Sequence, residues 1–265
     1  MLAVEPGLPD LFPGKMRVFL KSTDNLKIAA SHLPGKSPAV MFFPGFFSHM
    51  QGTKALWLEE CCKKRGQSYI RFDYRGHGES EGTFEESTIT DWLNDALLVL
   101  DKIAEPPVVA AGSSMGGWIA LLAALARPKI IRGFVGIASS PDFTKSIYEE
   151  RISDEERKLL HEIGYILRKS DYREEPVKIT QKLIDDGQKH NILNRNEIDL
   201  NIPACLIHGK KDIDVPWQKS ERLHQLIGKD NSELILVPNG EHRLSRPKEL
   251  ELIDAAVQKI CSLIT

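Results

Sequence analysis

An uncharged stretch of nineteen residues, 108–126, constrains the fold of this chain more than any other part of its sequence. Its length would suit a membrane-spanning helix, and Gly112 and Gly116 have the GxxxG spacing of helix dimers. A proline pair before the stretch, a glycine pair inside it and an Arg-Pro sequence after it instead favour a buried strand (108–112), a tight turn and a buried helix (115–126). The mean hydropathy of the chain is −0.26 and no second stretch could span a membrane, so we predict no membrane span.

Short β-rich runs alternate with helical patterns along the chain, which is typical of a parallel sheet covered by helices. The middle runs are continuously apolar, as expected for strands buried on both faces. The first two runs alternate in polarity and are joined by Thr23-Asp24-Asn25, which predicts an antiparallel hairpin at the sheet edge. The predicted fold is therefore α/β with a mostly parallel eight-stranded sheet. Its strands are expected at residues 17–21, 27–32, 40–43, 69–74, 108–112, 133–138, 204–208 and 234–237, and its helices at 54–65, 89–103, 115–126, 217–227 and 248–264.

The alternation stops between the sixth and seventh predicted strands. Residues 141–202 contain no convincing strand, and segments 155–167 and 177–185 have the pattern of amphipathic helices. Ligands of open α/β sheets bind beyond the carboxyl ends of the strands, which is where this insertion begins. We therefore predict a helical lid at 141–202 inserted into a core formed by residues 1–140 and 203–265.

The overall composition excludes several classes of partner. Lys plus Arg (35) nearly balances Asp plus Glu (37), giving a net charge of −2, so neither nucleic acid nor an anionic membrane is expected as the main partner. The four cysteines have no CxxC spacing, which indicates buried free thiols in a reducing compartment. The first ten residues show no secretory or transit pattern, so a cytoplasmic location is expected.

The uncharged stretch also contains a candidate nucleophile. Gly112-Ser113-Ser114-Met115-Gly116 is a G-x-S-x-G sequence placed between a predicted strand and a predicted helix. Such a turn forces its central residue into a strained backbone conformation and exposes its hydroxyl at a helix N-terminus. We predict that Ser114 is the nucleophile.

A serine nucleophile needs a base, and the base needs an acid that orients it. His242 follows the last predicted strand, on a loop that can reach the edge of the sheet. Asp212 and Asp214 both follow the strand at 204–208. We choose Asp212 and keep Asp214 as the alternative, because Asp214 directly precedes Val215-Pro216 and could cap the next helix.

Acyl transfer also needs hydrogen-bond donors for the tetrahedral oxyanion. We expect the backbone N–H of Met115 and that of Phe46, which follows the sharp Pro44-Gly45 turn after the third strand. Phe47 and Met50 in the same loop, together with Trp118, are expected to line an apolar acyl pocket.

Four motifs together resemble the α/β-hydrolase superfamily: residues 112–118, 71–80, 208–217 and 241–244. Within it they look closest to bacterial hydrolases related to the mitochondrial depalmitoylase, an acyl-protein thioesterase and acyl-glucuronide esterase. The resemblance implies a serine hydrolase that works through an acyl-enzyme intermediate on Ser114, with no metal or organic cofactor. One departure is Pro44, which stands where the family usually has histidine.

Several functions remain compatible with this sequence. Ester and thioester hydrolysis use the same triad, and the apolar Phe46-Phe47 pair favours a medium or long acyl chain. The alternatives are hydrolysis of a carbon–carbon bond in a dienoic acid or of a terminal peptide bond, and a non-catalytic binding module. The carbon–carbon and peptide substrates would need a charged anchor, and none is identified, because the arginines of the predicted lid look like a solvated face (Arg151, Arg157, Arg168 and Arg173). The protein is expected to be a monomer or a homodimer.

Overall fold

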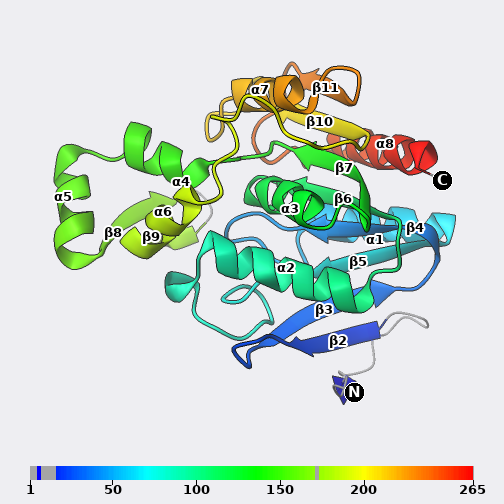
Figure 1. Cartoon of the computed structure of the whole chain (residues 1–265), viewed down its shortest axis with the longest axis horizontal. Helices are drawn as coiled ribbons and strands as arrows, with labels where there is room; N and C mark the ends of the chain where they lie inside the picture. Colours follow the sequence, from blue (N-terminus) through cyan, green and yellow to red (C-terminus); the bar gives the residue numbers. More distant parts are fainter. Residues whose placement is uncertain (1–4, 7–15, 171–172, 265) are drawn as a thin grey trace.

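The computed structural model describes residues 5–6, 16–170 and 173–264 and is built on a single nine-stranded sheet (Figure 1). Eight of its strands are the predicted ones, and a two-residue strand, β1 (Glu5–Pro6), adds to the edge. The strand order is β1-β2-β3-β5-β4-β6-β7-β10-β11. The eight strands are β2 (Met16–Lys21), β3 (Lys27–Leu33), β4 (Lys36–Phe43), β5 (Gln67–Phe72), β6 (Val108–Ser113), β7 (Ile131–Ile137), β10 (Ala204–Gly209) and β11 (Ser232–Val237).

The predicted hairpin at the sheet edge is confirmed. β2 pairs antiparallel with β3, and β3 is antiparallel to β5, whereas all pairs from β5 to β11 are parallel. In the central strand β6, Val108 and Ala110 point into one hydrophobic cluster while Val109 and Ala111 point into the other. Strand residues alternate between faces, so a continuously apolar strand fills both layers of the core.

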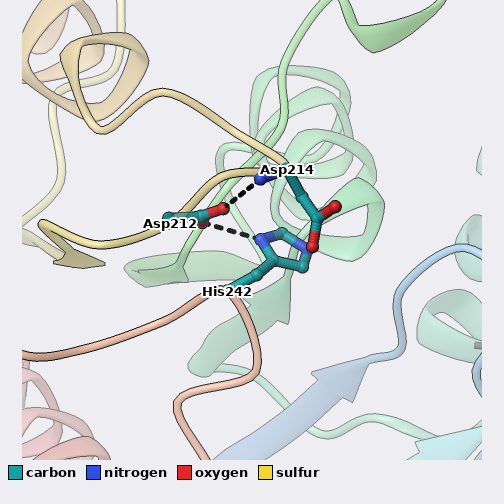
Figure 2. Close-up of side chains that lie close together, drawn as sticks. All are labelled: Asp212, Asp214 and His242. Atoms are coloured by element: carbon teal, nitrogen blue, oxygen red, sulfur yellow. Dashed lines mark hydrogen bonds and ion pairs between the residues drawn. The ribbon is translucent and has the colours of Figure 1, made fainter. Parts of the chain in front are cut away.

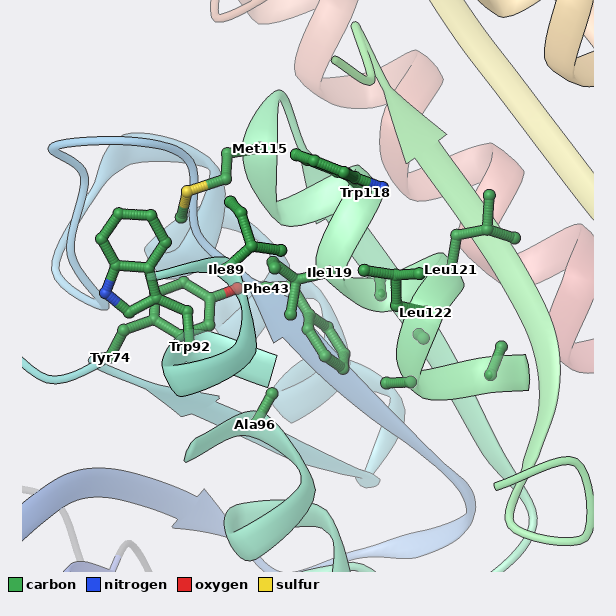
Figure 3. Packing of buried hydrophobic residues seen from close by; sticks show 14 of the residues in the cluster. Phe43, Tyr74, Ile89, Trp92, Ala96, Met115, Trp118, Ile119, Leu121 and Leu122 are labelled. Atoms are coloured by element: carbon green, nitrogen blue, oxygen red, sulfur yellow. The ribbon is translucent and has the colours of Figure 1, made fainter. Parts of the chain in front are cut away.

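Helices cover both faces of the sheet. α2 (Ile89–Ile103), α3 (Met115–Ala126) and α7 (Gln218–Ile227) contribute to the larger hydrophobic cluster, part of which is drawn in Figure 3. α1 (Thr53–Arg65) and α8 (Pro247–Leu263) cover the opposite face. These five helices lie close to their predicted positions. Nearly all of α3 is buried, which explains why its sequence carries no charge.

The insertion, residues 141–202, is not purely helical as predicted. It contains α4 (Phe143–Ser146), a π-helical turn (Ile147–Arg151), α5 (Asp154–Ile163) and α6 (Gln181–Gln188). It also contains an antiparallel hairpin of β8 (Tyr165–Ser170) and β9 (Arg173–Thr180). The predicted helix at 155–167 ends early, because Gly164 adopts left-handed backbone (φ 82°) and caps α5. The predicted helix at 177–185 begins only at Gln181, because the β-branched Val177 and Ile179 bury their side chains in β9.

Two carboxylates hold the insertion in place. Asp142, at the exit from β7, accepts hydrogen bonds from the backbone N–H groups of Ile192 and Leu193, both at 2.8 Å. Asp186 of α6 accepts from the backbone and hydroxyl of Thr90 at the start of α2, at 2.7 and 2.9 Å. Asp142 therefore joins the start of the insertion to its returning chain, and Asp186 ties the insertion to the core.

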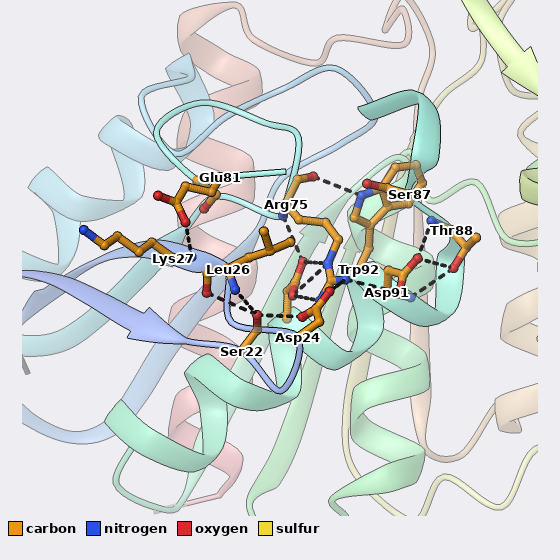
Figure 4. A network of polar contacts seen from close by, with 12 residues as sticks. Ser22, Asp24, Leu26, Lys27, Arg75, Glu81, Ser87, Thr88, Asp91 and Trp92 are labelled. Carbon is orange, nitrogen blue, oxygen red and sulfur yellow. Dashed lines mark hydrogen bonds and ion pairs between the residues drawn. The ribbon is translucent and has the colours of Figure 1, made fainter. Parts of the chain in front are cut away.

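A buried arginine organises the turn after β5 (Figure 4). The Arg75 guanidinium makes bidentate contacts with Asp95 of α2 at 2.8–3.2 Å and reaches Asp24 of the β2–β3 turn at 2.7 Å. Its carbonyl accepts from the Trp92 indole at 3.3 Å. This network fixes the turn that carries His77, close to the carboxyl end of the sheet.

No helix in the described ranges is both long and apolar enough to cross a membrane. All four cysteines are free thiols; three of them are buried and Cys61 is half-buried.

Candidate active site

Ser114 lies at the sharp turn between β6 and α3. Its backbone has φ 56° and ψ −121°, a conformation that non-glycine residues rarely adopt. The flanking glycines make the turn possible: a Cβ atom at Gly116 would lie 2.1 Å from the carbonyl oxygen of Phe43, and one at Gly112 would lie 2.3 Å from that of Gly116. The Ser114 side chain makes no capping bond to α3, so its hydroxyl is available for another partner.

That partner is His242, on the loop between β11 and α8. Its Nε2 atom lies 3.0 Å from Ser114 Oγ, and its Nδ1 atom lies 2.7 Å from Asp212 Oδ2. A carboxylate only accepts hydrogen bonds, so Nδ1 carries the proton and Nε2 is left to accept the serine hydroxyl. The structure thus brings Ser114, His242 and Asp212 into one hydrogen-bonded chain from three separate loops.

Asp212 is held by donors on both of its oxygens (Figure 2). Oδ1 accepts from the backbone N–H groups of Asp214 and Val215 at 2.9 and 2.8 Å, and Oδ2 accepts from His208 Nε2 at 3.0 Å as well as from His242. Burial would raise the pKa of this carboxyl, but the hydrogen bonds from His208 and His242 more than offset it and hold the pKa well below its ordinary value. Asp212 therefore stays ionised at neutral pH.

Asp214 also lies near His242 (Figure 2). Candidate ligand atoms of Asp212, Asp214 and His242 all lie within 4.8 Å of one another, a spacing that could suit a metal ion. The Nδ1 atom of His242 donates to Asp212 Oδ2 at 2.7 Å and its Nε2 atom lies 3.0 Å from Ser114 Oγ, so both ring nitrogens already have partners in the Ser114–His242–Asp212 chain.

The two predicted oxyanion donors flank the serine. Met115 is the first residue of α3, and Phe46 follows Gly45, whose Cα packs so closely that a Cβ there would lie 3.3 Å from the Ser114 Cβ. Among the described residues, neither the Phe46 nor the Met115 N–H donates to another backbone carbonyl. Both donors are therefore available beside the nucleophile.

A cavity of about 660 Å³ opens beside Ser114 and His242. Phe46, Phe47 and Phe143 form part of its wall, with Phe46 5.1 Å from Phe143 between ring centroids. Two predicted pocket residues do not line this cavity.

Met50 is fully buried and faces the core instead. Its backbone N–H donates to Asp73 at 2.6 Å and its carbonyl accepts from Arg71 at 2.8 Å. Trp118 is buried in α3, where its indole donates to the carbonyl of His190 at 3.2 Å (Figure 3). A helical residue four positions after the nucleophile lies one turn further along α3, away from the turn that carries Ser114.

Sequence reasoning misplaced two arginines and left out a histidine. Arg151 and Arg168, interpreted from sequence as part of a solvated face, line the cavity. His208, to which the sequence analysis assigns no role, is fully buried and contacts Asp212 Oδ2 through its Nε2 atom, while its Nδ1 atom lies 2.7 Å from Ser220 Oγ. Its place four residues before Asp212, at the end of a buried strand, is the one sequence signal that could have revealed this contact.

Comparison with known proteins identifies the family of the chain. The family model described as serine aminopeptidase, S33, matches residues 35–182. The palmitoyl-protein thioesterases ABHD10, mitochondrial, of Bos taurus and Homo sapiens are each 36% identical over 250 residues, covering 93% of this chain and 81% of theirs. The solved structure of alpha/beta hydrolase domain-containing protein 10 from mouse has a TM-score of 0.87 at 34% identity, covering 94% of this chain and 99% of that one.

Proposed function

Since the chain belongs to the α/β-hydrolase superfamily, in the family described as serine aminopeptidase, S33, and is a serine hydrolase of carboxylic esters or thioesters, we propose that Ser114, His242 and Asp212 are its catalytic triad. The observation that carries this assignment is the hydrogen-bonded chain from Ser114 Oγ through the His242 ring to Asp212, at 3.0 and 2.7 Å.

The reaction proceeds in two halves. The Ser114 oxygen attacks the acyl carbon while His242 Nε2 takes the serine proton, and the protonated imidazole then gives this proton to the departing alcohol or thiol. Water next attacks the acyl-enzyme, again passing a proton to His242. The proton returns to Ser114 as the carboxylic acid leaves. Asp212 holds the imidazole in the required tautomer throughout.

The oxyanion of both tetrahedral intermediates is bound by the N–H groups of Phe46 and Met115. Support comes from their position beside Ser114 and from the N-terminus of α3, whose dipole favours negative charge at this point. Because both donors belong to the backbone, replacement of the family's usual histidine by Pro44 leaves them in place.

The substrate is a thioester with a medium or long acyl chain. The relatives in cattle and humans are named as palmitoyl-protein thioesterases, and the cavity offers an aromatic wall around Phe46, Phe47 and Phe143 for such a chain. The insertion acts as the lid, since Val177 and Ile179 of β9 also line the cavity. An aminopeptidase would bind the positive charge of an N-terminal amine, which the lysines and arginines of this cavity oppose.

Location and assembly remain predictions. The relatives are named as mitochondrial proteins, so a cytoplasmic location of this chain needs its own test by cell fractionation. The expected monomer or homodimer can be resolved by sedimentation.

The test of the triad is the intact mass of the protein after treatment with a fluorophosphonate. We expect one adduct on wild type and none on Ser114→Ala, whose turnover of a palmitoyl thioester should fall by about a thousandfold or more. Ser113→Ala is the matched control, because it removes the neighbouring serine of the same turn, and it should still be labelled. An adduct on Ser114→Ala, or none on folded wild type, would refute the assignment.

A further inference from the structure

Positive charge is concentrated in the cavity beside Ser114. Among the described residues that line it, one is an acid, Asp214, and six are lysine or arginine. The whole chain has a net charge of −2, so composition does not account for this bias. We call these six residues the cationic wall: Lys54, Arg151, Arg168, Lys169, Lys219 and Arg243.

Neutral oxygen atoms hold three members of the cationic wall in place. Lys54 Nζ donates to the carbonyl of Arg243 and Lys219 Nζ donates to Ser146 Oγ, both at 2.5 Å, and Arg151 donates to the carbonyl of Asp214. Such bonds orient a cation without cancelling its charge. The ion pair of Arg168 with Glu156 is longer, at 3.5 Å. Glu249 near Lys54, and Glu150 and Asp142 near Lys219, offset part of this positive charge, but none of these three acids lines the cavity, so the lining itself carries net positive charge.

Two of these cations are partly withdrawn from water. Burial lowers the pKa of Lys54, to about 8, and also lowers that of Lys219. At neutral pH the Lys54 amine is still mostly protonated, at a cost that a bound anion would reduce. This is the electrostatic condition expected of an anion-binding surface.

The rest of the cavity is apolar. Phe46, Phe47, Phe143 and Ile147 lie on its wall and suit the acyl chain of the proposed substrate. The cationic wall is then available to bind the leaving group. One carboxylate is satisfied by a single arginine, whereas several phosphate groups make use of several lysines and arginines at once.

We propose that this site takes acyl thioesters whose leaving thiol carries phosphate groups, as in coenzyme A. This inference rests on the proposed function, because it assigns the leaving group of the same hydrolysis. Water supplies a hydroxyl to the acyl carbon, and the thiol leaves with the remaining proton.

Three thioesters of one acyl chain test the proposal: the coenzyme A thioester, the 3-mercaptopropionate thioester with one carboxylate, and the neutral N-acetylcysteamine thioester. We expect kcat/KM to be about tenfold or more higher for the coenzyme A thioester than for the neutral one at 50 mM salt. The ratio should shrink at 500 mM salt, because ions screen exposed charges. Equal rates for these two, or a preference for the carboxylate, would overturn the proposal.

Charge-removing variants localise the effect. Arg151→Gln combined with Lys219→Met should reduce the ratio of the two kcat/KM values to about threefold or less. Lys158→Met is the matched control; this exposed lysine of α5 pairs with Glu162 outside the cavity, so the ratio should not change. A ratio insensitive to the double substitution contradicts the proposal. If none of the three thioesters is hydrolysed, the result counts against the proposed function itself.

Discussion

At the residue scale, Asp212 differs from the neighbouring Asp214 in the hydrogen bonds that its carboxylate accepts. Four donors reach the two oxygens of Asp212, two from backbone N–H groups and two from histidine rings. An asparagine at position 212 could not accept all four hydrogen bonds, because its amide NH₂ group would point at one of the donors. The neighbouring Asp214 supplies a backbone N–H to this arrangement, and substitution of its side chain leaves that donor in place.

We therefore predict that Asp212→Asn lowers kcat by about 10³- to 10⁴-fold, through loss of the imidazole tautomer that accepts the serine proton. Asp214→Asn should cost less than about tenfold, since its carboxylate is outside the Ser114–His242–Asp212 chain. Steady-state kinetics of both variants at pH 8, with circular dichroism to verify folding, gives the comparison. If kcat falls further in Asp214→Asn than in Asp212→Asn, then Asp214 is the acid that orients His242.

Sequence could predict the type and order of these residues but not every contact. Ser114 and His242 were identified because each stands at a fixed point relative to a strand, and strand ends of a parallel sheet share one edge. Asp212 and Asp214 lie two residues apart on one loop, and only the folded loop shows which of them meets the imidazole. The burial of Met50 was not predictable, because its place in the loop is held by a hydrogen bond from its backbone N–H to Asp73, more than twenty residues away.

At the element scale, the insertion depends on few anchors. Asp142 combines a left-handed backbone (φ 56°) with two hydrogen bonds to the returning chain at Ile192 and Leu193. Asparagine tolerates this backbone but offers only one carbonyl oxygen, so one N–H would lose its acceptor.

Asp142→Asn should therefore loosen the insertion by about 1–3 kcal/mol while leaving the sheet intact. Hydrogen exchange by mass spectrometry should show faster exchange in peptides from 143–190 and no change in those from β10. Asp154→Asn, at an exposed site on α5, serves as the control. Uniform acceleration throughout the chain would mean that Asp142 supports the whole fold.

The hairpin inside the insertion was missed for a local reason. Segments 155–167 and 177–185 contain apolar residues at helical spacing, but each spans a boundary between two elements. Gly164 ends α5, and the side chain of Thr180 caps α6 by accepting from the N–H of Leu183. The spacing of apolar residues is judged over a window that can include two elements, so it does not show where one ends. Capping residues do mark that boundary.

At the scale of the whole molecule, acid should destabilise the fold through His77. Its ring is buried among Phe47, Phe84, Tyr74 and Trp92, and burial lowers its pKa to about 4, from 6.5. The unfolded chain then binds a proton more readily than the folded one. This contribution to stability is complete above pH 6.5 and is lost as the pH falls towards 4.

Urea unfolding at pH 7 and pH 5 tests this expectation. We expect wild type to lose roughly 2 kcal/mol more stability than His77→Phe over this range. Phenylalanine fits the aromatic surroundings of this site. The substitution removes the contact between His77 Nδ1 and the Arg75 carbonyl, but this carbonyl still accepts a hydrogen bond from the Trp92 indole. The same pH dependence in both proteins would assign the effect to other groups.

The six parallel strands were predictable because such strands leave apolar runs in the sequence, and β2 and β3 were predictable because their polarity alternates on either side of a turn. The order of the strands in the sheet was not predicted. It follows from crossovers whose lengths and directions the local pattern does not specify.

Strands β7 and β10 are parallel neighbours, and the insertion is the only chain that joins them. Parallel neighbours need a crossover, so this segment can never be deleted outright, although any crossover of sufficient reach could replace it. During evolution the insertion can therefore be replaced by a different segment while the register of the sheet and the position of Ser114 stay the same. New substrate preferences can arise in such a lineage without the chemistry being reinvented.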